Sequence, residues 1–235
     1  MKNVYFDSAA TTQVRPEVVT AMTEVLNHTY GNASSTHSTG RDAKGLIETA
    51  RKSIAKHLNV TASEIIFTSG GTEADNLVLN SAVRDLGVKT IITSKIEHHA
   101  VLYKVNQLKE QYNINVHYVN VGSCGHIDYN HLEELLEANT DVLVSLMHVN
   151  NEVGSILDIK RVGDLCKQYE ALFHSDTVQS VGHYKLDLQD INIDFLAAAA
   201  HKFHGPKGIG FAYVKKSSGL KPLIYGGEQE RGLRA

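Results

Sequence analysis

The chain has few cysteines: only two occur among its 235 residues. Two thiols make no disulfide framework, which is typical of proteins from a reducing compartment. No apolar run approaches the roughly 20 residues that a membrane-spanning helix needs, and the start lacks the charged-then-apolar layout of a signal peptide. These absences lead us to expect a cytoplasmic protein with no membrane partner.

The chain also has little excess of either sign of charge, because its formal net charge is only −3. Such a chain offers no general attraction to a phosphate backbone, so direct binding of nucleic acid is not expected. The 13 histidines form no recognisable metal motif. The adjacent His98 and His99 cannot both face one ion from an extended segment, and the pattern H-E-x-x-H is absent. We therefore expect no metal site.

What the sequence does contain is an alternation of helical stripes with short apolar runs. Apolar residues at three-to-four spacing predict one helix that opens at Pro16 and another over about 43–58. The apolar runs predict strands at 65–67, 90–93, 115–119, 142–146, 172–174, 195–197 and 210–214. Because these runs are apolar on both faces, we predict an α/β fold with a mostly parallel central sheet covered by helices on both faces. A chain of this length and 42% hydrophobic content suffices for one such domain over residues 1–235.

Lys202 stands between an apolar run at 191–196, which predicts a strand, and the glycine-rich turn 203–208. A lysine that is partly desolvated loses its proton more easily and can form a Schiff base with a carbonyl compound. The alternative is an ordinary lysine that points into water. Asp176 favours the reactive interpretation, because it ends the preceding predicted strand and the interval between the two residues fits one crossover. The carboxyl ends of neighbouring strands meet in one crevice of an open α/β sheet.

A carboxylate that faces an imine-forming lysine suggests pyridoxal phosphate as the cofactor. The ring of this cofactor withdraws electrons well only while its nitrogen is protonated, and an ionised Asp176 would keep it so. Asp176 is also a candidate cap for a helix beginning at Thr177, and both roles can hold together.

The cofactor's phosphate also needs a binding site, and the segment 64–77 reads as a strand, a tight Gly70-Gly71 turn and the start of a helix. Free backbone N–H groups and the positive end of a helix attract anions. The segment matches neither G-x-G-x-x-G nor the Walker pattern, so it gives little support for dinucleotide or ATP binding.

Several motifs occur in a fixed order along the chain, at 5–12, 31–40, 68–73, 97–101, 147–154, 176–182, 201–208 and 226–232. With this ordered set the chain resembles the cysteine desulfurases, which belong to the class V aminotransferase superfamily and have the fold type I of pyridoxal phosphate enzymes. The segment Phe203-His204-Gly205-Pro206-Lys207-Gly208 resembles the corresponding segment in the group of that family that serves general iron–sulfur assembly.

The resemblance implies a role for each matching residue of the site. Lys202 would bond to the cofactor and later move protons, Asp176 would hold the ring nitrogen, and His98 would stack on the ring and relay protons. Partners for the phenolic oxygen and the substrate would be Asn151 and Gln179. The phosphate would be held by Gly71, Thr72 and His201. Without the resemblance, His98 is simply a histidine after the strand 90–93, and Asn151 is a turn residue.

The chain also departs from the family pattern. Ala199 stands where the family usually has serine, so one hydroxyl contact to phosphate would be absent. The family continues beyond the position of Ala235 into a smaller C-terminal domain that carries the nucleophilic cysteine, and neither Cys124 nor Cys166 matches the motif of that cysteine. We therefore expect this chain to bind the cofactor without full turnover.

The activity implied by the resemblance is the conversion of L-cysteine to L-alanine. The sulfur would pass as a persulfide to an iron–sulfur scaffold or a tRNA-thiolation protein, and the full-length form would be a homodimer. Three alternatives remain. They are another class V enzyme such as a selenocysteine lyase or an aminotransferase, a non-catalytic fragment that binds pyridoxal phosphate, and an NAD-dependent oxidoreductase on a similar sheet.

Overall fold

A seven-stranded mixed sheet forms the centre of the computed structural model, which describes residues 4–216 and 218–235. The sheet order is β1-β7-β6-β5-β4-β2-β3. Only β7 runs antiparallel to its neighbours, β1 and β6, and the other pairs are parallel. The predicted mostly parallel sheet is therefore confirmed. The strands are β1 (Ile65–Thr68), β2 (Thr90–Thr93), β3 (Asn115–Tyr118), β4 (Val142–Ser145), β5 (Leu172–Asp176), β6 (Phe195–Ala199) and β7 (Gly210–Val214).

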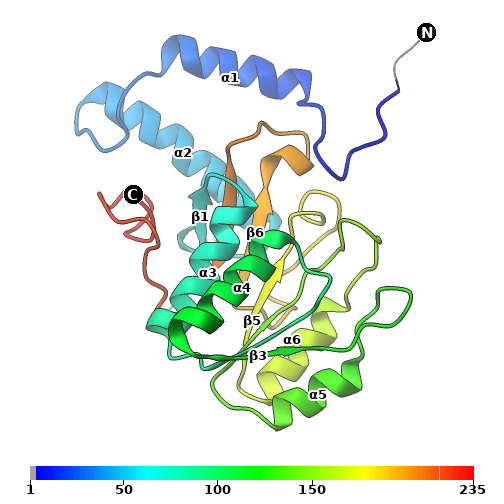
Figure 1. Cartoon of the computed structure of the whole chain (residues 1–235). Coiled ribbons are helices and arrows are strands. Elements are labelled where there is room, and N and C mark those ends of the chain that lie inside the picture. The colour runs from blue at the N-terminus through cyan, green and yellow to red at the C-terminus, as the bar shows by residue number, and fades with distance from the viewer. Residues whose placement is uncertain (1–3, 217) are drawn as a thin grey trace.

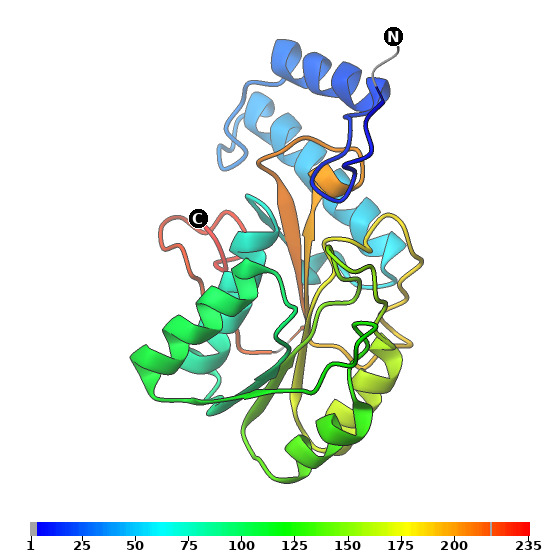
Figure 2. The same ribbon diagram turned by 45° about the vertical axis from the view of Figure 1, so that its right-hand side comes forward.

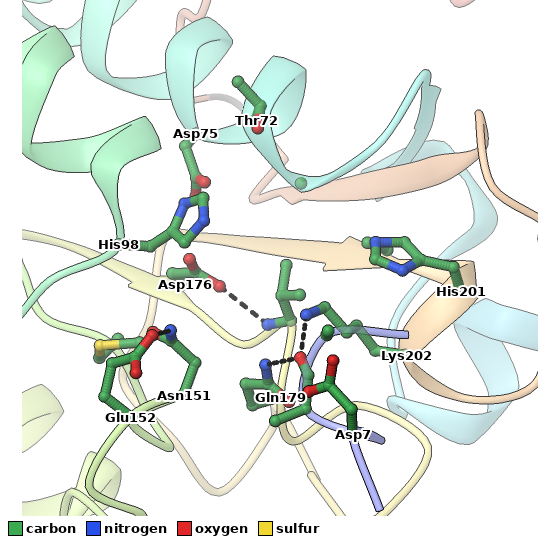
Figure 3. Close-up of a pocket in the computed structure, with 16 residues that line it drawn as sticks. Asp7, Thr72, Asp75, His98, Asn151, Glu152, Asp176, Gln179, His201 and Lys202 are labelled. Atoms are coloured by element: carbon green, nitrogen blue, oxygen red, sulfur yellow. Dashed lines mark hydrogen bonds between the residues drawn. The ribbon is translucent and has the colours of Figure 1, made fainter. Parts of the chain in front are cut away.

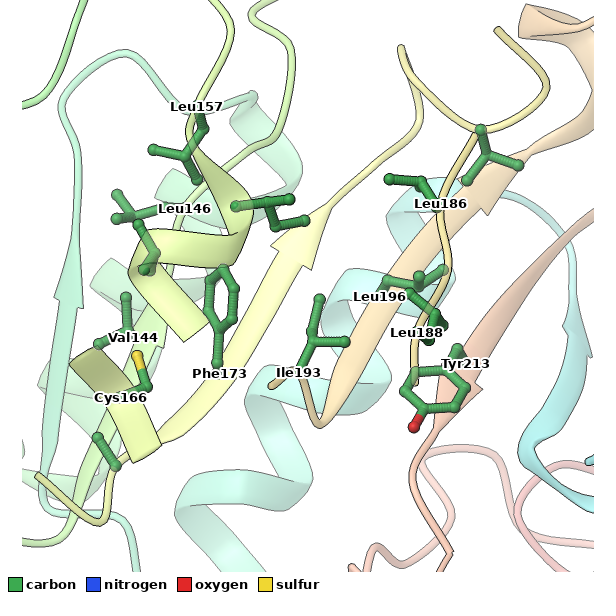
Figure 4. Close-up of a cluster of buried hydrophobic side chains, with 14 of the residues drawn as sticks. Val144, Leu146, Leu157, Cys166, Phe173, Leu186, Leu188, Ile193, Leu196 and Tyr213 are labelled. Carbon is green, nitrogen blue, oxygen red and sulfur yellow. The ribbon is translucent and has the colours of Figure 1, made fainter. Parts of the chain in front are cut away.

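Helices cover both faces of the sheet, as Figures 1 and 2 show. One face carries α3 (Gly71–Asp85) and α4 (His99–Tyr112), and the other carries α5 (Tyr129–Glu137) and α6 (Ile159–Gln168). Successive strand residues alternate between two buried apolar clusters, with Ile91 on the α3 side and Ile92 on the α6 side. Figure 4 shows the cluster on the α6 side, where Phe173 lies beside Cys166. The sheet is thus a rigid layer between two cores.

Two helices lie at one end of this sandwich. They are α1 (Pro16–His28), which begins with its proline in the first turn, and α2 (Ser38–His57). No residue of α1 is buried, and Met22 and Leu26 on its apolar stripe are exposed. The C-terminal half of α2 reaches the core through Ala55. Figure 1 shows α1 and the start of α2 extending away from the sheet.

Two predictions made from the sequence are wrong around β5 and β6. The strand predicted at 191–196 begins only at Phe195, because Asn192 and Asp194 use their side chains to bond outside the sheet ladder, to Asp164 and to the N–H of Phe173. The helix predicted from Thr177 is absent. The hydroxyl of Thr177 instead donates to the carbonyl of Ala197 on β6, and the residues after Thr177 form a turn.

Within residues 4–216 and 218–235 we find no helix that is both long enough and apolar enough to cross a membrane. Two short 3₁₀ segments, η1 (Ala62–Glu64) and η2 (Ala200–Lys202), connect the helices and strands.

Arg51 of α2 fastens the C-terminal segment to the sheet. Its side chain is buried, stacks on Phe67 with the guanidinium 4.7 Å from the ring centroid, and donates to the carbonyl of Ile65 at 2.7 Å. The guanidinium also makes two hydrogen bonds to Glu230, at 2.6 and 2.9 Å, and one to Glu48 at 2.9 Å. Removal of one partner from a buried bidentate pair is strongly destabilising, because the other partner is left as an uncompensated charge.

We predict that Arg51→Met destabilises the chain by about 3–5 kcal/mol, because the Glu230 carboxylate then has no cationic partner. Urea unfolding followed by circular dichroism measures the change. Lys52→Met is the matched control, since Lys52 is the next residue of the same helix and is exposed. A loss for Arg51→Met no larger than that of Lys52→Met would show that the pair contributes nothing.

Candidate active site

A cavity of about 450 Å³ opens at the carboxyl ends of the parallel strands. All eight residues that the sequence predicted for the site line it, and Figure 3 shows most of them facing a common space. They come from the starts of α3 and α4 and from the segments after β4, β5 and β6. These residues are Gly71, Thr72, His98, Asn151, Asp176, Gln179, His201 and Lys202.

Lys202 is the last residue of η2, three positions beyond the end of β6. It is half-buried, and Nζ donates a hydrogen bond to the carbonyl of Ala9. Burial lowers the pKa of Lys202, although Asp176 and Asp7 oppose this by favouring the charged amine. The amine therefore loses its proton more easily than an ordinary lysine, as a carbonyl-reactive lysine requires.

Asp176 ends β5, which is the parallel neighbour of β6, so the predicted meeting of Asp176 and Lys202 at adjacent strand ends is confirmed. The carboxyl is buried, and Oδ1 accepts from the N–H of Val178 at 2.9 Å. Burial raises the pKa of Asp176 to about 7, repulsion from Asp75 adds to this, and the Val178 N–H opposes it. A cationic ring nitrogen beside this carboxyl would favour its ionised form.

The start of α3 has the shape of an anion cradle. Gly70 has φ of +155°, a conformation that favours glycine. A Cβ on Gly71 would lie 2.5 Å from Cγ2 of Val178, so only glycine lets the helix start so close to the turn after β5. The first N–H groups of a helix have no acceptor within it and attract phosphate. Thr72 and His201 also line the cavity.

Ala199 also lines the cavity beside this cradle. It is buried at the end of β6, and a Cβ on Gly71 would lie 3.9 Å from the Cβ of Ala199. A hydroxyl at position 199 would therefore sit next to the first turn of α3. The alanine leaves that part of the cradle without a side-chain donor.

His98 is the N-cap residue of α4, and its Nδ1 accepts from the N–H of Ala100 at 3.1 Å. In the neutral ring the proton is then on Nε2, the other ring nitrogen. Figure 3 shows the ring of His98 beside Asp75 and above Asp176. A planar ring placed over the carboxyl would therefore have the imidazole as a neighbour.

The two amide side chains of the site bond to nearby chain segments. Gln179 Nε2 donates to the Ala9 carbonyl at 2.9 Å, the same oxygen that accepts from Lys202. Asn151 Nδ2 donates to Glu152 at 2.7 Å. The residue Ala9 thus brings the N-terminal segment against the site, which the sequence motif at 5–12 did not by itself reveal.

Several lining residues were missed by sequence reasoning. Asp75 follows Gly71 by four positions and therefore shares its helix face, which is a signal that the sequence contained. Asp7 and Ala9 lay within a quoted motif without an assigned role. The other missed residues are Ala10, Met147, Glu152 and Val178.

Buried acidic groups gather behind the cavity. Burial raises the pKa of Asp75 to about 8 and that of Glu97 to about 8. Burial also lowers the pKa of His174 to about 4. Together with Asp176, this part of the site is rich in carboxyl groups that have no fixed cation bonded to them among the described residues.

Neither cysteine lines the cavity. Cys166 is buried in α6, where burial raises the pKa of its thiol, and Cys124 is exposed in a turn. The expectation that neither belongs to the reacting group is consistent with these positions.

Comparison with known proteins gives a consistent group of relatives. The chain is 43% identical to cysteine desulfurase IscS of Dictyoglomus turgidum and 42% identical to putative cysteine desulfurase IscS 1 of Bacillus subtilis, in both cases over its whole length. It spans 59% and 62% of the lengths of these two relatives.

Solved structures of other proteins also have a fold similar to that of the chain. A NifS-like protein superposes with a TM-score of 0.95 at 41% identity, over 100% of this chain and 65% of that one. The protein SspA in complex with cysteine gives a TM-score of 0.94 at 37% identity, over 99% of this chain and 68% of that one. These neighbours have fold type I of pyridoxal phosphate enzymes, which confirms the predicted fold class. The family described as aminotransferase class-V matches residues 4–233, and the chain belongs to that family.

Proposed function

We propose that this chain contributes the pyridoxal phosphate-binding large domain of a cysteine desulfurase, an enzyme that converts L-cysteine to L-alanine. The observation that carries the proposal is the meeting of Lys202, Asp176 and the start of α3 in one cavity. Its relatives carry the name cysteine desulfurase at about 43% identity. A cavity of about 450 Å³ suits a small cofactor with an amino acid beside it.

The residues of the cavity fit the chemical groups of pyridoxal phosphate. The carboxyl of Asp176 would hold the proton of the ring nitrogen, and the N–H groups at Gly71 and Thr72 would bind the phosphate. His98 would stack on the ring, and His201 would add a donor to the phosphate. Gln179 and Asn151 would contact the phenolic oxygen and the substrate. When bound, the cofactor supplies an aldehyde and an electron-withdrawing ring.

Lys202 would do two things in the reaction. Its amine, made more readily neutral by burial, would bond to the aldehyde carbon before substrate arrives. After the amino acid displaces it, the free amine would take the proton from the substrate Cα and later return one. His98, with a proton on Nε2, would relay protons at the same face.

The fate of the sulfur also follows from the proposed family activity. A cysteine thiolate would attack the substrate Sγ, and the Cβ–Sγ bond would break with its electron pair left on the carbon skeleton that becomes alanine. The resulting persulfide would pass its outer sulfur to an iron–sulfur scaffold or a tRNA-thiolation protein. Neither Cys124 nor Cys166 is assigned that role. We further propose a homodimer, supported by the resemblance, and a cytoplasmic location, supported by the low cysteine content.

The covalent role of Lys202 has a direct test. Borohydride reduction of the chain incubated with pyridoxal phosphate should add one phosphopyridoxyl group, which is the cofactor less one water plus two hydrogens, to the wild type and to Lys207→Ala, and none to Lys202→Ala. Intact-mass spectrometry with peptide mapping measures the site. Lys207 is the control because it is an exposed lysine in the same turn. Labelling that persists in Lys202→Ala would overturn the proposal.

Ala199→Ser should tighten the binding of pyridoxal phosphate by about tenfold, because a hydrogen bond to a charged group contributes about 1.5–3 kcal/mol. Fluorescence titration measures the dissociation constant. Pyridoxal, which has no phosphate, is the control ligand and should bind both forms alike. Equal gains for both ligands would mean that the added hydroxyl does not act on the phosphate.

The raised pKa of Asp75 predicts a pH effect on stability. The folded carboxyl keeps its proton up to about pH 8, whereas the unfolded one loses it near pH 4. The stabilisation is thus fully present below pH 4 and is lost as the pH rises through the folded pKa. Relative to Asp75→Asn, the wild type should lose roughly 1–3 kcal/mol between about pH 5 and pH 7.

Urea unfolding of the chain without cofactor at a series of pH values measures this difference. Asp42→Asn, at an exposed carboxylate of α2, is the control and should follow the wild type. A difference between wild type and Asp75→Asn that does not change with pH would contradict the assignment of a buried, protonated Asp75.

A further inference from the structure

A chain of three buried polar side chains lies behind Asp176, and the proposed function leaves it without a role. Ser145 Oγ and His174 Nδ1 are 2.9 Å apart. His174 Nε2 lies 3.3 Å from Oδ1 of Asp75. Neither atom makes a hydrogen bond of regular geometry with any described residue, so two unsatisfied buried polar atoms face each other. All three side chains are at most 1% exposed.

The fold brings these residues together for geometric reasons. His174 and Asp176 are two positions apart on β5, so both side chains point to the α3 face of the sheet. Ser145 is the partner of His174 in the register between β4 and β5. Asp75 comes down from α3, and Figure 3 shows it on the same wall of the cavity as Asp176 and His98. Asp75 is therefore close to both His174 and the carboxyl that faces the cavity.

The protonation of Asp75 affects the charge of Asp176. An ionised Asp75 repels an ionised Asp176, and this repulsion is one cause of the raised pKa of Asp176. If Asp75 and His174 hold one proton between them, the pair carries no net charge. Ser145 can accept from Nδ1–H, so the imidazole is satisfied whether the shared proton is on its Nε2 or on the carboxyl.

We propose that His174 is a positioning residue that keeps one proton on the Asp75–His174 pair, so that the negative charge facing the cofactor's ring nitrogen belongs to Asp176 alone. This inference rests on the proposed binding of pyridoxal phosphate. No proton leaves the pair in this role, and the proton between ring nitrogen and Asp176 is a separate one.

The other charged groups around the pair do not replace His174. Glu97 is bonded to Ser94 at 2.7 Å and to the N–H of Met147 at 2.9 Å, and burial raises its pKa to about 8, so it supplies no positive charge to the pair. The groups that face this region come from the N-terminal segment, α3, the start of α4, β5 and η2. They are Asp7, Asp75, Glu97, His98, His174, Asp176 and Lys202.

The test compares pyridoxal phosphate with its 1-deaza analogue, in which a C–H group replaces the ring nitrogen. The ratio of the two dissociation constants, measured by titration near neutral pH, isolates the contribution of that nitrogen. The wild type should prefer pyridoxal phosphate by at least about tenfold. In His174→Gln the preference should fall at least threefold, because the amide N–H of glutamine can donate to Asp75 and favour its ionised form, which then shares the negative charge with Asp176. Binding of the deaza analogue should change less than twofold.

A second substitution tests the reason for the loss. Adding Asp75→Asn to His174→Gln should restore the preference, because residue 75 can then no longer take a share of the negative charge from Asp176. His148→Gln is the matched control, since His148 is another buried histidine near β4 whose Nδ1 has no partner among the described residues. It should leave the ratio unchanged. If His174→Gln does not fold, Ser145→Ala should give a smaller fall in the same direction, because the Nδ1–H of His174 loses its acceptor and Nε2 is held less firmly as the acceptor for the Asp75 proton.

The outcomes separate this inference from the function on which it rests. Equal weakening of both ligands in His174→Gln, or an unchanged ratio, would overturn the role of His174 while leaving cofactor binding intact. Failure of Asp75→Asn to restore the preference would overturn it as well. A wild type that binds neither ligand would instead overturn the proposed function, and this inference with it.

Discussion

The burial of the Asp176 carboxyl is the constraint on which the site depends. A carboxyl with one backbone donor and a carboxyl neighbour is not stable as an anion by itself, and its pKa rises to about 7. A cation placed against it removes that penalty. The protein therefore presents a position that favours a positively charged ring nitrogen, and the lysine and the phosphate cradle line the same cavity.

The parallel part of the sheet explains why these groups meet. β2, β4, β5 and β6 end at the same edge, and each is followed by a residue of the cavity. Because the side chains of a strand alternate, the last residues on the α3 side form a polar layer at the end of an otherwise apolar core. Ser145, His174 and Asp176 belong to this layer. The residues one position earlier, such as Phe173, belong to the opposite core.

Much of this arrangement was predictable from sequence, and the rest was not for physical reasons. The ordered motifs and the strand-end positions of Asp176 and Lys202 predicted the fold class and the eight lining residues. The start of β6 was missed because Asn192 and Asp194 lie in an apolar run but bond outside the sheet ladder. The partnership of Asp75 and His174 joins a helix to a strand about a hundred positions away, so no local pattern reveals it.

Two buried groups of charges show how differently one chain can treat such residues. Arg51 meets Glu230 and Glu48 with short hydrogen bonds, so its charge is matched within the fold and the pair holds the C-terminal segment in place. Asp75, Glu97 and Asp176 are also buried, yet no arginine or lysine within residues 4–216 and 218–235 is bonded to them. The fold matches a buried charge in one place and leaves buried carboxyls without a cation in another, beside a cavity. Ionising such a carboxyl costs stability, and a cationic ligand beside it offsets that cost, so the carboxyl cluster together with the lysine indicates the kind of molecule that the cavity binds.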